Sequence, residues 1–126
     1  MNLPNEIVFE NQRDEEFERH IVEALDLLPE NFLKQLNNVS IVVEDKQRTM
    51  TNSFLLGLYH GIPQPLKGPY YSFVLPDKIT LYKENIENVS RERDIPLKQI
   101  IAEVLFHEIG HYFGLSESEL DLFRTF

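Results

Sequence analysis

The sequence predicts an α+β fold, and three observations carry this prediction. Apolar residues at helical spacing occupy 14–28, β-branched and apolar segments lie between 39 and 84, and a second helical pattern runs over 94–114. The strands are therefore grouped between helices and do not alternate with them, which favours α+β over α/β. Because the chain has 126 residues, we expect one domain that spans residues 1–126.

Residues 14–28 predict the first helix. Its apolar stripe has helical spacing and consists of Phe17, Ile21, Ala24, Leu25 and Leu28. Acidic residues gather in the first turn, where negative charge is stabilised by the helix dipole. Pro29 interrupts the pattern, and we expect another short turn of helix over 30–36.

Four short segments predict strands. The first, 39–45, is β-branched and apolar on both faces, which is typical of a strand that is covered on both sides. The other three are expected at 53–61, 70–76 and 77–84, with a long Gly- and Pro-rich loop over 61–69. In the last strand, apolar residues alternate with Thr and Tyr, which indicates a half-buried edge or near-edge strand.

The helix predicted over 94–114 carries the informative motif. Asp94 is a good N-cap and Pro96 fits the first helical turn. Gly114 can end the helix in the left-handed conformation. One face of this helix is formed by Ile100, Val104, His107 and His111.

His107, Glu108 and His111 form a His-Glu-x-x-His motif on this helix. The two histidines point the same way, so both rings can reach one cation at roughly 2.0–2.1 Å. Glu108 lies beside the metal rather than on it, where its carboxylate can take a proton from water. The pattern predicts a zinc site, with Glu108 as the catalytic base.

A helix with two partly buried histidines and a surface glutamate is the alternative interpretation. Gly110 argues against it, because a glycine inside a helix costs about 1 kcal/mol and needs a compensating reason. We expect that another backbone packs close to the helix at this residue.

The chain contains no cysteine, which excludes disulfides, thiolate zinc sites and a cysteine nucleophile. A transition metal must then be held by imidazole and carboxylate groups. Since no histidine follows His111, we expect a carboxylate as third ligand. The candidates are Glu117, Glu119 and Asp121.

A capping box separates these candidates. Ser116 and Glu119 match its pattern, with Ser116 as the N-cap of a short helix over 117–125. Glu119 then has another role, whereas Glu117 is free to turn back to the metal. We therefore favour Glu117 as the third ligand.

Composition and charge limit the classes of partner and the cell compartment that we expect. Twenty-one acidic and 12 basic residues give a formal net charge of −9, and no basic face indicates a nucleic-acid partner. No apolar run approaches the roughly 20 residues that cross a bilayer, so we expect no membrane segment. The N-terminus lacks the pattern of a secretory signal, and we expect a cytoplasmic protein.

Three segments resemble zincins, and more closely the short bacterial zincin-like domains, a family of zinc metallopeptidases with an HExxHxxGxxE-type motif. The segments are GLYHG at 57–61, LPDKITLYKENI at 75–86 and HEIGHYFGLSESEL at 107–120. The last also parallels the long metzincin signature, in which the position of Glu117 holds a histidine or an aspartate. The chain departs from metzincins because it has no later methionine turn, and from gluzincins because only 15 residues follow His111.

This resemblance implies a zincin-like domain in which a small mixed sheet packs on the active-site helix. It implies a Zn²⁺ cofactor on His107 and His111, with Glu108 as the base that activates water for peptide-bond hydrolysis. The expected partner is a peptide or protein substrate, and an extended peptide could add alongside the strand near 78–83. Candidates for stabilising the oxyanion, each with a competing packing or loop role, are Tyr70, Tyr71, Tyr82, Tyr112 and His60.

Two alternatives to a general zinc peptidase remain open from the sequence. One is a non-catalytic zinc-binding interaction module, although Glu108 argues against it because a structural site needs no base. The other is a dedicated regulatory protease that cleaves one partner protein.

Overall fold

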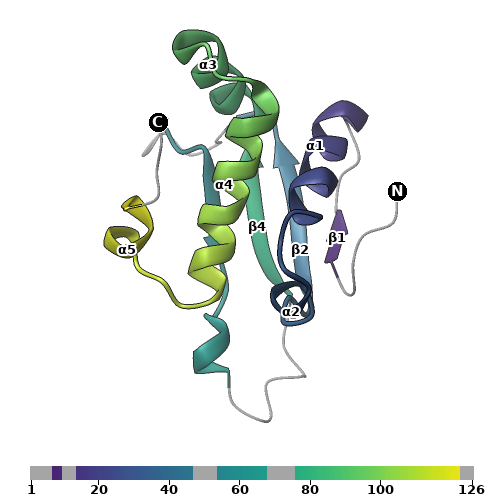
Figure 1. Ribbon diagram of the computed structural model, residues 1–126, viewed down its shortest axis with the longest axis vertical. Helices are drawn as coiled ribbons and strands as arrows, with labels where there is room; N and C mark the ends of the chain where they lie inside the picture. The colour runs from purple at the N-terminus through teal and green to yellow at the C-terminus, as the bar shows by residue number, and fades with distance from the viewer. Residues whose placement is uncertain (1–6, 10–13, 47–53, 68–75, 123–126) are drawn as a thin grey trace.

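A four-stranded mixed sheet with helices packed on one face forms the frame of the protein (Figure 1). The computed structural model describes residues 7–9, 14–46, 54–67 and 76–122. In spatial order the strands are β1 (Ile7–Phe9), β2 (Val39–Glu44), β4 (Asp77–Tyr82) and β3 (Gly57–His60). The first three strands run parallel and β3 runs antiparallel to β4, which confirms the predicted small mixed sheet.

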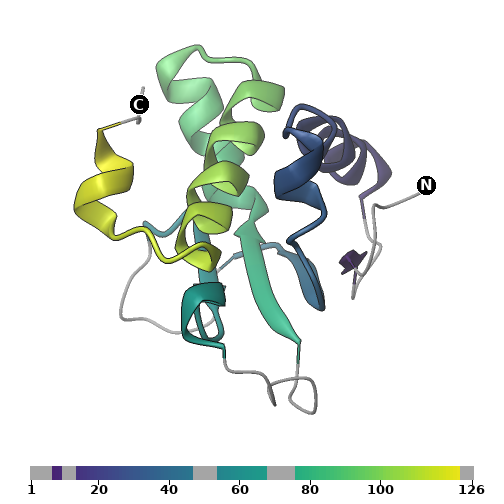
Figure 2. The same ribbon diagram turned by 60° about the horizontal axis from the view of Figure 1, so that its bottom comes forward.

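Two long helices, α1 and α4, lie side by side over the sheet (Figures 1 and 2). The helices are α1 (Glu15–Leu25), α2 (Glu30–Leu33), α3 (Lys83–Arg93), α4 (Leu97–Tyr112) and α5 (Glu117–Asp121), with a 3₁₀ turn η1 (Gln64–Leu66). The α+β prediction is confirmed, and so are the helical turn after Pro29 and a short helix that begins at Glu117. No helix in the described part of the chain is long and apolar enough to cross a membrane.

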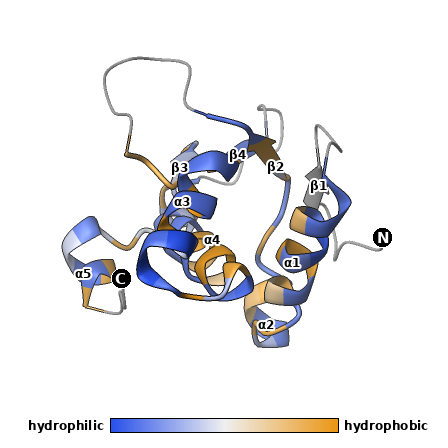
Figure 3. Ribbon diagram, turned by 90° about the horizontal axis from the view of Figure 1, so that it is seen from above, coloured by the Kyte–Doolittle hydropathy of each residue, from blue (hydrophilic) through white to orange (hydrophobic). Residues whose placement is uncertain are grey.

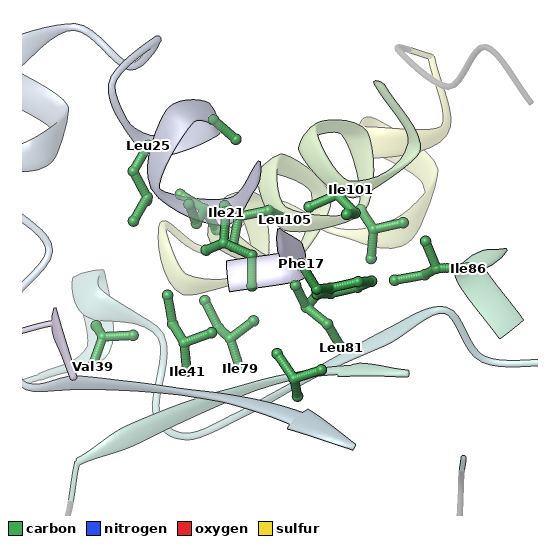
Figure 4. Packing of buried hydrophobic residues seen from close by; sticks show 14 of the residues in the cluster. Phe17, Ile21, Leu25, Val39, Ile41, Ile79, Leu81, Ile86, Ile101 and Leu105 are labelled. Atoms are coloured by element: carbon green, nitrogen blue, oxygen red, sulfur yellow. The ribbon is translucent and has the colours of Figure 1, made fainter. Parts of the chain in front are cut away.

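The hydrophobic core fills the space between the helices and the sheet (Figure 4). Ile41, Ile79 and Leu81 point from the central strands toward the helices, and each is at most 1% exposed. The facing residues come from α1 and α4, and they are Phe17, Ile21, Leu25, Ile101 and Leu105. Because α4 is part of this core along most of its length, its remaining face is held in a fixed orientation toward β3 and α5.

The two central strands are buried on both faces. Ser40 and Val42 on β2, and Thr80 on β4, are buried although they point away from the α1/α4 layer. This confirms the prediction of a covered strand at β2. β4 is second from the edge and pairs with β2 and β3 on its two sides, so the near-edge position is confirmed and the edge position is wrong. The expectation that this strand is half-buried is also wrong, because residues on both of its faces are buried. Peptide addition alongside residues 78–83 is therefore also wrong, because no side of this strand is open.

The structure corrects the prediction for residues 83–96. α3 spans Lys83–Arg93, where the sequence predicted the end of a strand at residue 84 and no helix before residue 94. Asp94 is the C-cap of α3, with φ 51°, and not the N-cap of α4; α4 begins at Leu97 after Pro96. Only Ile86 of α3 is buried, and its ribbon is mostly hydrophilic (Figure 3), so the helix shows too little apolar periodicity to be recognised. The strand predicted at 70–76 lies almost entirely outside the described residues.

Candidate metal centre

Two histidines of α4 and one glutamate of α5 meet at the C-terminal end of α4. The rings of His107 and His111 have centroids 5.0 Å apart. Nε2 of His107 lies 3.0 Å from Oε2 of Glu117, and Nε2 of His111 lies 2.7 Å from Oε1 of the same carboxylate. Within the described residues, one ligand atom from each of these three side chains lies within 4.8 Å of the other two, which is close enough to share one metal ion.

The orientation of His111 is fixed by the chain that follows α4. Its Nδ1 lies 2.8 Å from the carbonyl oxygen of Leu115, so Nδ1–H donates to this carbonyl and the lone pair lies on Nε2. That lone pair then faces the carboxylate of Glu117, and the two repel each other unless a proton or a cation lies between them. A backbone carbonyl behind a ligating imidazole is a common feature of metal sites. The donor set therefore fits a metal ion.

The charge state of Glu117 also fits a metal ligand. Burial raises the pKa of Glu117, but its hydrogen bond with His111 and the electrostatic and hydrogen-bond interactions with both histidines lower it more, so the net shift is downward. The carboxylate is thus held in its ionised form, which is the form that binds metal.

A turn and a capping box return the chain so that Glu117 faces the histidines. Gly114 has φ +92°, and the amide of Leu115 donates to the carbonyl of Gly110, so α4 ends as predicted. Ser116 is the N-cap of α5: its hydroxyl accepts from the amide of Glu119, and its own amide donates to the Glu119 carboxylate at 3.1 Å. The predicted capping box is present, and Glu117 becomes the first residue of α5.

The geometry also shows which of the three candidate carboxylates lies at the histidines. The carboxylate of Glu119 is hydrogen-bonded to Ser116, whose hydroxyl lies 2.9 Å from Oε1 of Glu119. Asp121 is exposed and is not part of the His107, His111 and Glu117 group. The structure therefore brings Glu117, and neither of the other two carboxylates, to the histidines.

Gly110 allows the Leu120 side chain of α5 to pack against α4. A Cβ atom at this residue would lie 2.4 Å from Cδ2 of Leu120, which is too close for any real contact. The sequence predicted a close neighbour at Gly110, and one is present. It is the Leu120 side chain, however, and not another backbone.

Glu108 is buried beside the histidines and separate from the ligand group. Its side chain is 7% exposed and it lines two cavities that flank the site. A Cβ at Gly57 would lie 3.2 Å from Cγ of Glu108 and 2.8 Å from Cγ1 of Val104, so only glycine lets β3 approach α4 here. This gives the first glycine of the GLYHG segment a physical reason.

Sequence reasoning missed a polar cluster that fixes the loop after β3. The hydroxyl of Tyr59 donates to Oδ2 of Asp77 at 2.6 Å, and Nζ of Lys67 donates to the same oxygen at 2.8 Å. Asp77 is 1% exposed, and a Cβ at Gly61 would lie 2.6 Å from its Cγ, which explains the second glycine of GLYHG. The sequence feature that could have revealed this cluster is the position of Asp77, a charged residue at the start of an apolar strand.

The oxyanion candidates that lie within the described residues do not gather at the site. The hydroxyl of Tyr112 donates to the carbonyl of Gln35 at 2.8 Å and accepts from the amide of Asn37 at 3.3 Å, so it anchors α4 to the loop before β2. Tyr82, whose pKa is raised by burial and then by Glu44 and Glu108, lines neither flanking cavity, and the same holds for His60. The remaining two candidates, Tyr70 and Tyr71, lie outside the described residues.

Comparison with known proteins adds one finding. A family model described as zincin-like metallopeptidase matches residues 36–124, which is more than half of the chain and includes every residue of the site. No curated protein in the comparison matches the chain.

Proposed function

The chain belongs to the zincin-like metallopeptidase family, and from the geometry of its site we propose that it is a zinc-dependent peptidase. His107, His111 and Glu117 hold the metal, and Glu108 is the general base. The observation that carries the proposal is the approach of two imidazoles and one carboxylate beside a second glutamate, Glu108, which is buried. Two histidines and one glutamate are a known ligand set of catalytic zinc sites, which leave one position for water or substrate.

Each residue of the site then has one role. Zinc, when bound, supplies a Lewis acid that polarises the peptide carbonyl and makes water more acidic. Glu108 takes the proton from the attacking water and delivers it to the leaving amine. The Leu115 carbonyl orients His111, and the Ser116 capping box orients Glu117, so both ligands are placed before the metal binds.

The edge of the sheet supports an extended substrate. β3 is the edge strand next to the site, and among the described residues its only strand partner is β4. We propose that the substrate peptide adds to the outer side of β3 through main-chain hydrogen bonds. This replaces the expectation that β4 would receive the peptide.

Zinc content is the first test. We expect about one zinc per chain by elemental analysis of the wild type. His107→Ala should abolish binding and Glu117→Ala should weaken it, whereas the controls His60→Ala and Asp121→Ala should keep the metal. Asp121 is a suitable control because it is exposed on the same helix as Glu117. No zinc in the wild type, even after resupply, would overturn the proposal.

Catalysis is tested separately with Glu108→Gln. This variant should keep zinc and lose turnover of peptides that the zinc-loaded wild type cleaves. Loss of zinc in Glu108→Gln would contradict the role of a base. A wild type that binds zinc but cleaves no peptide in a broad library would instead favour a non-catalytic zinc-binding module. Cleavage of a single protein partner and of no library peptide would favour a dedicated regulatory protease.

A further inference from the structure

Two cavities flank the candidate metal centre, a larger one of about 660 Å³ and a smaller one of about 360 Å³. The smaller cavity lies on the His111 side and shares Glu108 and Glu117 with the larger one. A peptide that adds to the outer side of β3, as proposed above, passes along its wall. The rest of this wall comes from β3, the loop over 61–67 and the turn after α4, and consists of Leu58, Tyr59, Gly61, Pro63, Gly114 and Leu115.

Lys67, at the end of the 61–67 loop, joins this loop to two other parts of the protein. Its Nζ donates to Oδ2 of Asp77 at 2.8 Å, and Asp77 is the first residue of β4. The same Nζ lies 4.6 Å from the ring centroid of Tyr112, which is the last residue of α4 and follows His111 directly. A cation over the face of an aromatic ring is attracted to it. One ammonium group therefore ties the loop both to the sheet and to the last turn of α4.

The link between Lys67 and Asp77 is shielded from water. The two side chains are 15% and 1% exposed. Oδ2 of Asp77 accepts from both Lys67 and Tyr59, whereas Oδ1 is buried and, within the described residues, has no hydrogen-bond partner. Lys67 thus supplies the positive charge that balances Asp77. Such a pair is screened less by salt than an exposed one.

The loop packs against the turn that follows α4. A Cβ at Gly114 would lie 3.2 Å from Cγ of Pro65, so loop and turn are already in contact. The turn itself is held by the amide of Leu115, which donates to the carbonyl of Gly110. The Leu115 carbonyl that orients His111 therefore does not depend on Lys67. The position of the loop across the smaller cavity does depend on it.

We propose that Lys67 is a positioning residue, which fixes the 61–67 loop against α4 and so sets the shape of the smaller cavity where the substrate chain binds. The inference rests on the proposed peptidase function and assigns a determinant of its KM. Lys67 lines neither cavity, so it acts through the loop and not by contact with the substrate.

The kinetic test uses zinc-loaded protein and a peptide that the wild type cleaves. Lys67→Met keeps the stem and removes the ammonium, so KM should rise by about 10-fold, the effect of losing one hydrogen bond between charged groups. Zinc content and kcat should stay near the wild-type values, because only binding is changed. Lys67→Arg should restore KM, since a guanidinium group can bond to a carboxylate and stack on an aromatic ring.

Lys34→Met is the matched control, because Lys34 pairs with Glu30 on the exposed surface and lines neither cavity. An unchanged KM in Lys67→Met, or an equal rise in Lys34→Met, would overturn the proposal.

A double variant separates positioning from stability. Lys67→Met alone leaves the buried charge of Asp77 unpaired, which destabilises the fold. When Asp77→Asn is added, that charge is removed and the thermal stability should return toward the wild-type value. KM should stay raised, because the link between loop and sheet is still absent. A KM that recovers together with the stability would show that Lys67 is structural only. If Lys67→Met does not fold, the double variant carries the kinetic test.

Methyl NMR tests the same cavity without any turnover. Leu58 and Leu115 contribute to its wall from β3 and from the turn after α4. Their methyl signals should shift in Lys67→Met and in the double variant, and stay near the wild-type positions in Lys67→Arg and Lys34→Met. A wild type that cleaves no peptide would overturn the peptidase function, and these signals then decide on Lys67 by themselves. Unchanged signals in both variants that lack the ammonium would overturn its positioning role.

Discussion

Leu120 occupies the space that any side chain at Gly110 would need, since a Cβ there would lie 2.4 Å from Leu120 Cδ2. This contact joins the helix that carries both histidines to the short helix that carries Glu117. α5 spans only Glu117–Asp121, and Leu120 is its one buried residue. The position of the proposed third ligand therefore depends on this packing contact, together with the capping box at Ser116.

Gly110→Ala should consequently weaken metal binding without weakening α4. Alanine favours the helix by about 1 kcal/mol, but its Cβ must displace Leu120 and with it α5. We expect zinc affinity to fall by about 10- to 100-fold, as for other groups that orient ligands. Competition with a chromogenic chelator measures this. In a double-mutant cycle with Leu120→Ala the two losses should not add; additive losses would contradict the contact.

Gly57→Ala should separate catalysis from metal binding. The added Cβ would lie 3.2 Å from Cγ of Glu108, so the base must move, whereas the histidines and Glu117 are not among its near neighbours. A contact at 3.2 Å requires a shift of a few tenths of an ångström, and misplacement of a catalytic group lowers turnover steeply. We expect kcat/KM to fall by roughly 3- to 10-fold while zinc stoichiometry stays at the wild-type value.

Gly61→Ala is the control for this variant, because its Cβ would meet Asp77 and Tyr59 instead of Glu108. Its effect should appear in thermal stability and much less in the activity of the folded protein. Equal losses of activity in the two variants would argue that Gly57 has no special relation to the base.

The part of the site that lies within one helix could be predicted from the sequence. The His-Glu-x-x-His spacing fixes which residues share a face of α4, and this depends only on helix geometry. The capping box at Ser116 is likewise a local pattern, and it assigns Glu119 to the helix cap, which leaves Glu117 as the candidate ligand. Local hydrogen bonds and helical periodicity are properties that short segments carry by themselves.

Features that depend on distant contacts could not be predicted in this way. α3 has one buried residue, Ile86, so its helical character leaves little apolar pattern, and Asp94 matches the pattern of an N-cap although it is the C-cap of α3. The neighbour of Gly110 comes from α5, and the large cavity combines residues from the segment before β3 with three helices. Their proximity is set by the packing of α4 between the sheet and α5.

Tyr112→Phe tests whether this tyrosine is structural. Its hydroxyl bonds to the backbone of Gln35 and Asn37, and Tyr112 lines neither of the cavities that flank the histidines. Its removal leaves a carbonyl and an amide without this partner, so we expect a loss of about 1–3 kcal/mol in the free energy of unfolding. Urea denaturation measures the loss. The activity per folded molecule should stay unchanged, and a drop of 100-fold would return Tyr112 to the oxyanion candidates.

The ion pair between Asp14 and Lys83 should make stability depend on pH. Asp14 caps α1 by accepting from the amide of Phe17, and its Oδ2 lies 2.8 Å from Nζ of Lys83. The hydrogen bond with Lys83, then that with Phe17, lowers the pKa of Asp14 below its ordinary value of 3.8. A lowered pKa in the folded state gives stability that is present above 3.8 and is lost as pH falls through the folded pKa. Lys83 has a raised pKa for the same main reason, so its contribution is lost only at strongly alkaline pH.

Asp14→Asn isolates this charge effect, because asparagine is an equally good N-cap. At pH 7 we expect the variant to lose about 0.5–1 kcal/mol in the free energy of unfolding, the usual range for a partly exposed pair. The difference from wild type should shrink as pH falls below 3.8, where the wild-type carboxyl is also becoming neutral. Urea titrations at pH 7 and at acidic pH measure this, with Asp26→Asn on the exposed C-cap of the same helix as the control. A difference that persists undiminished at the lowest pH would show that the Asp14 charge contributes nothing, and that the loss comes from packing.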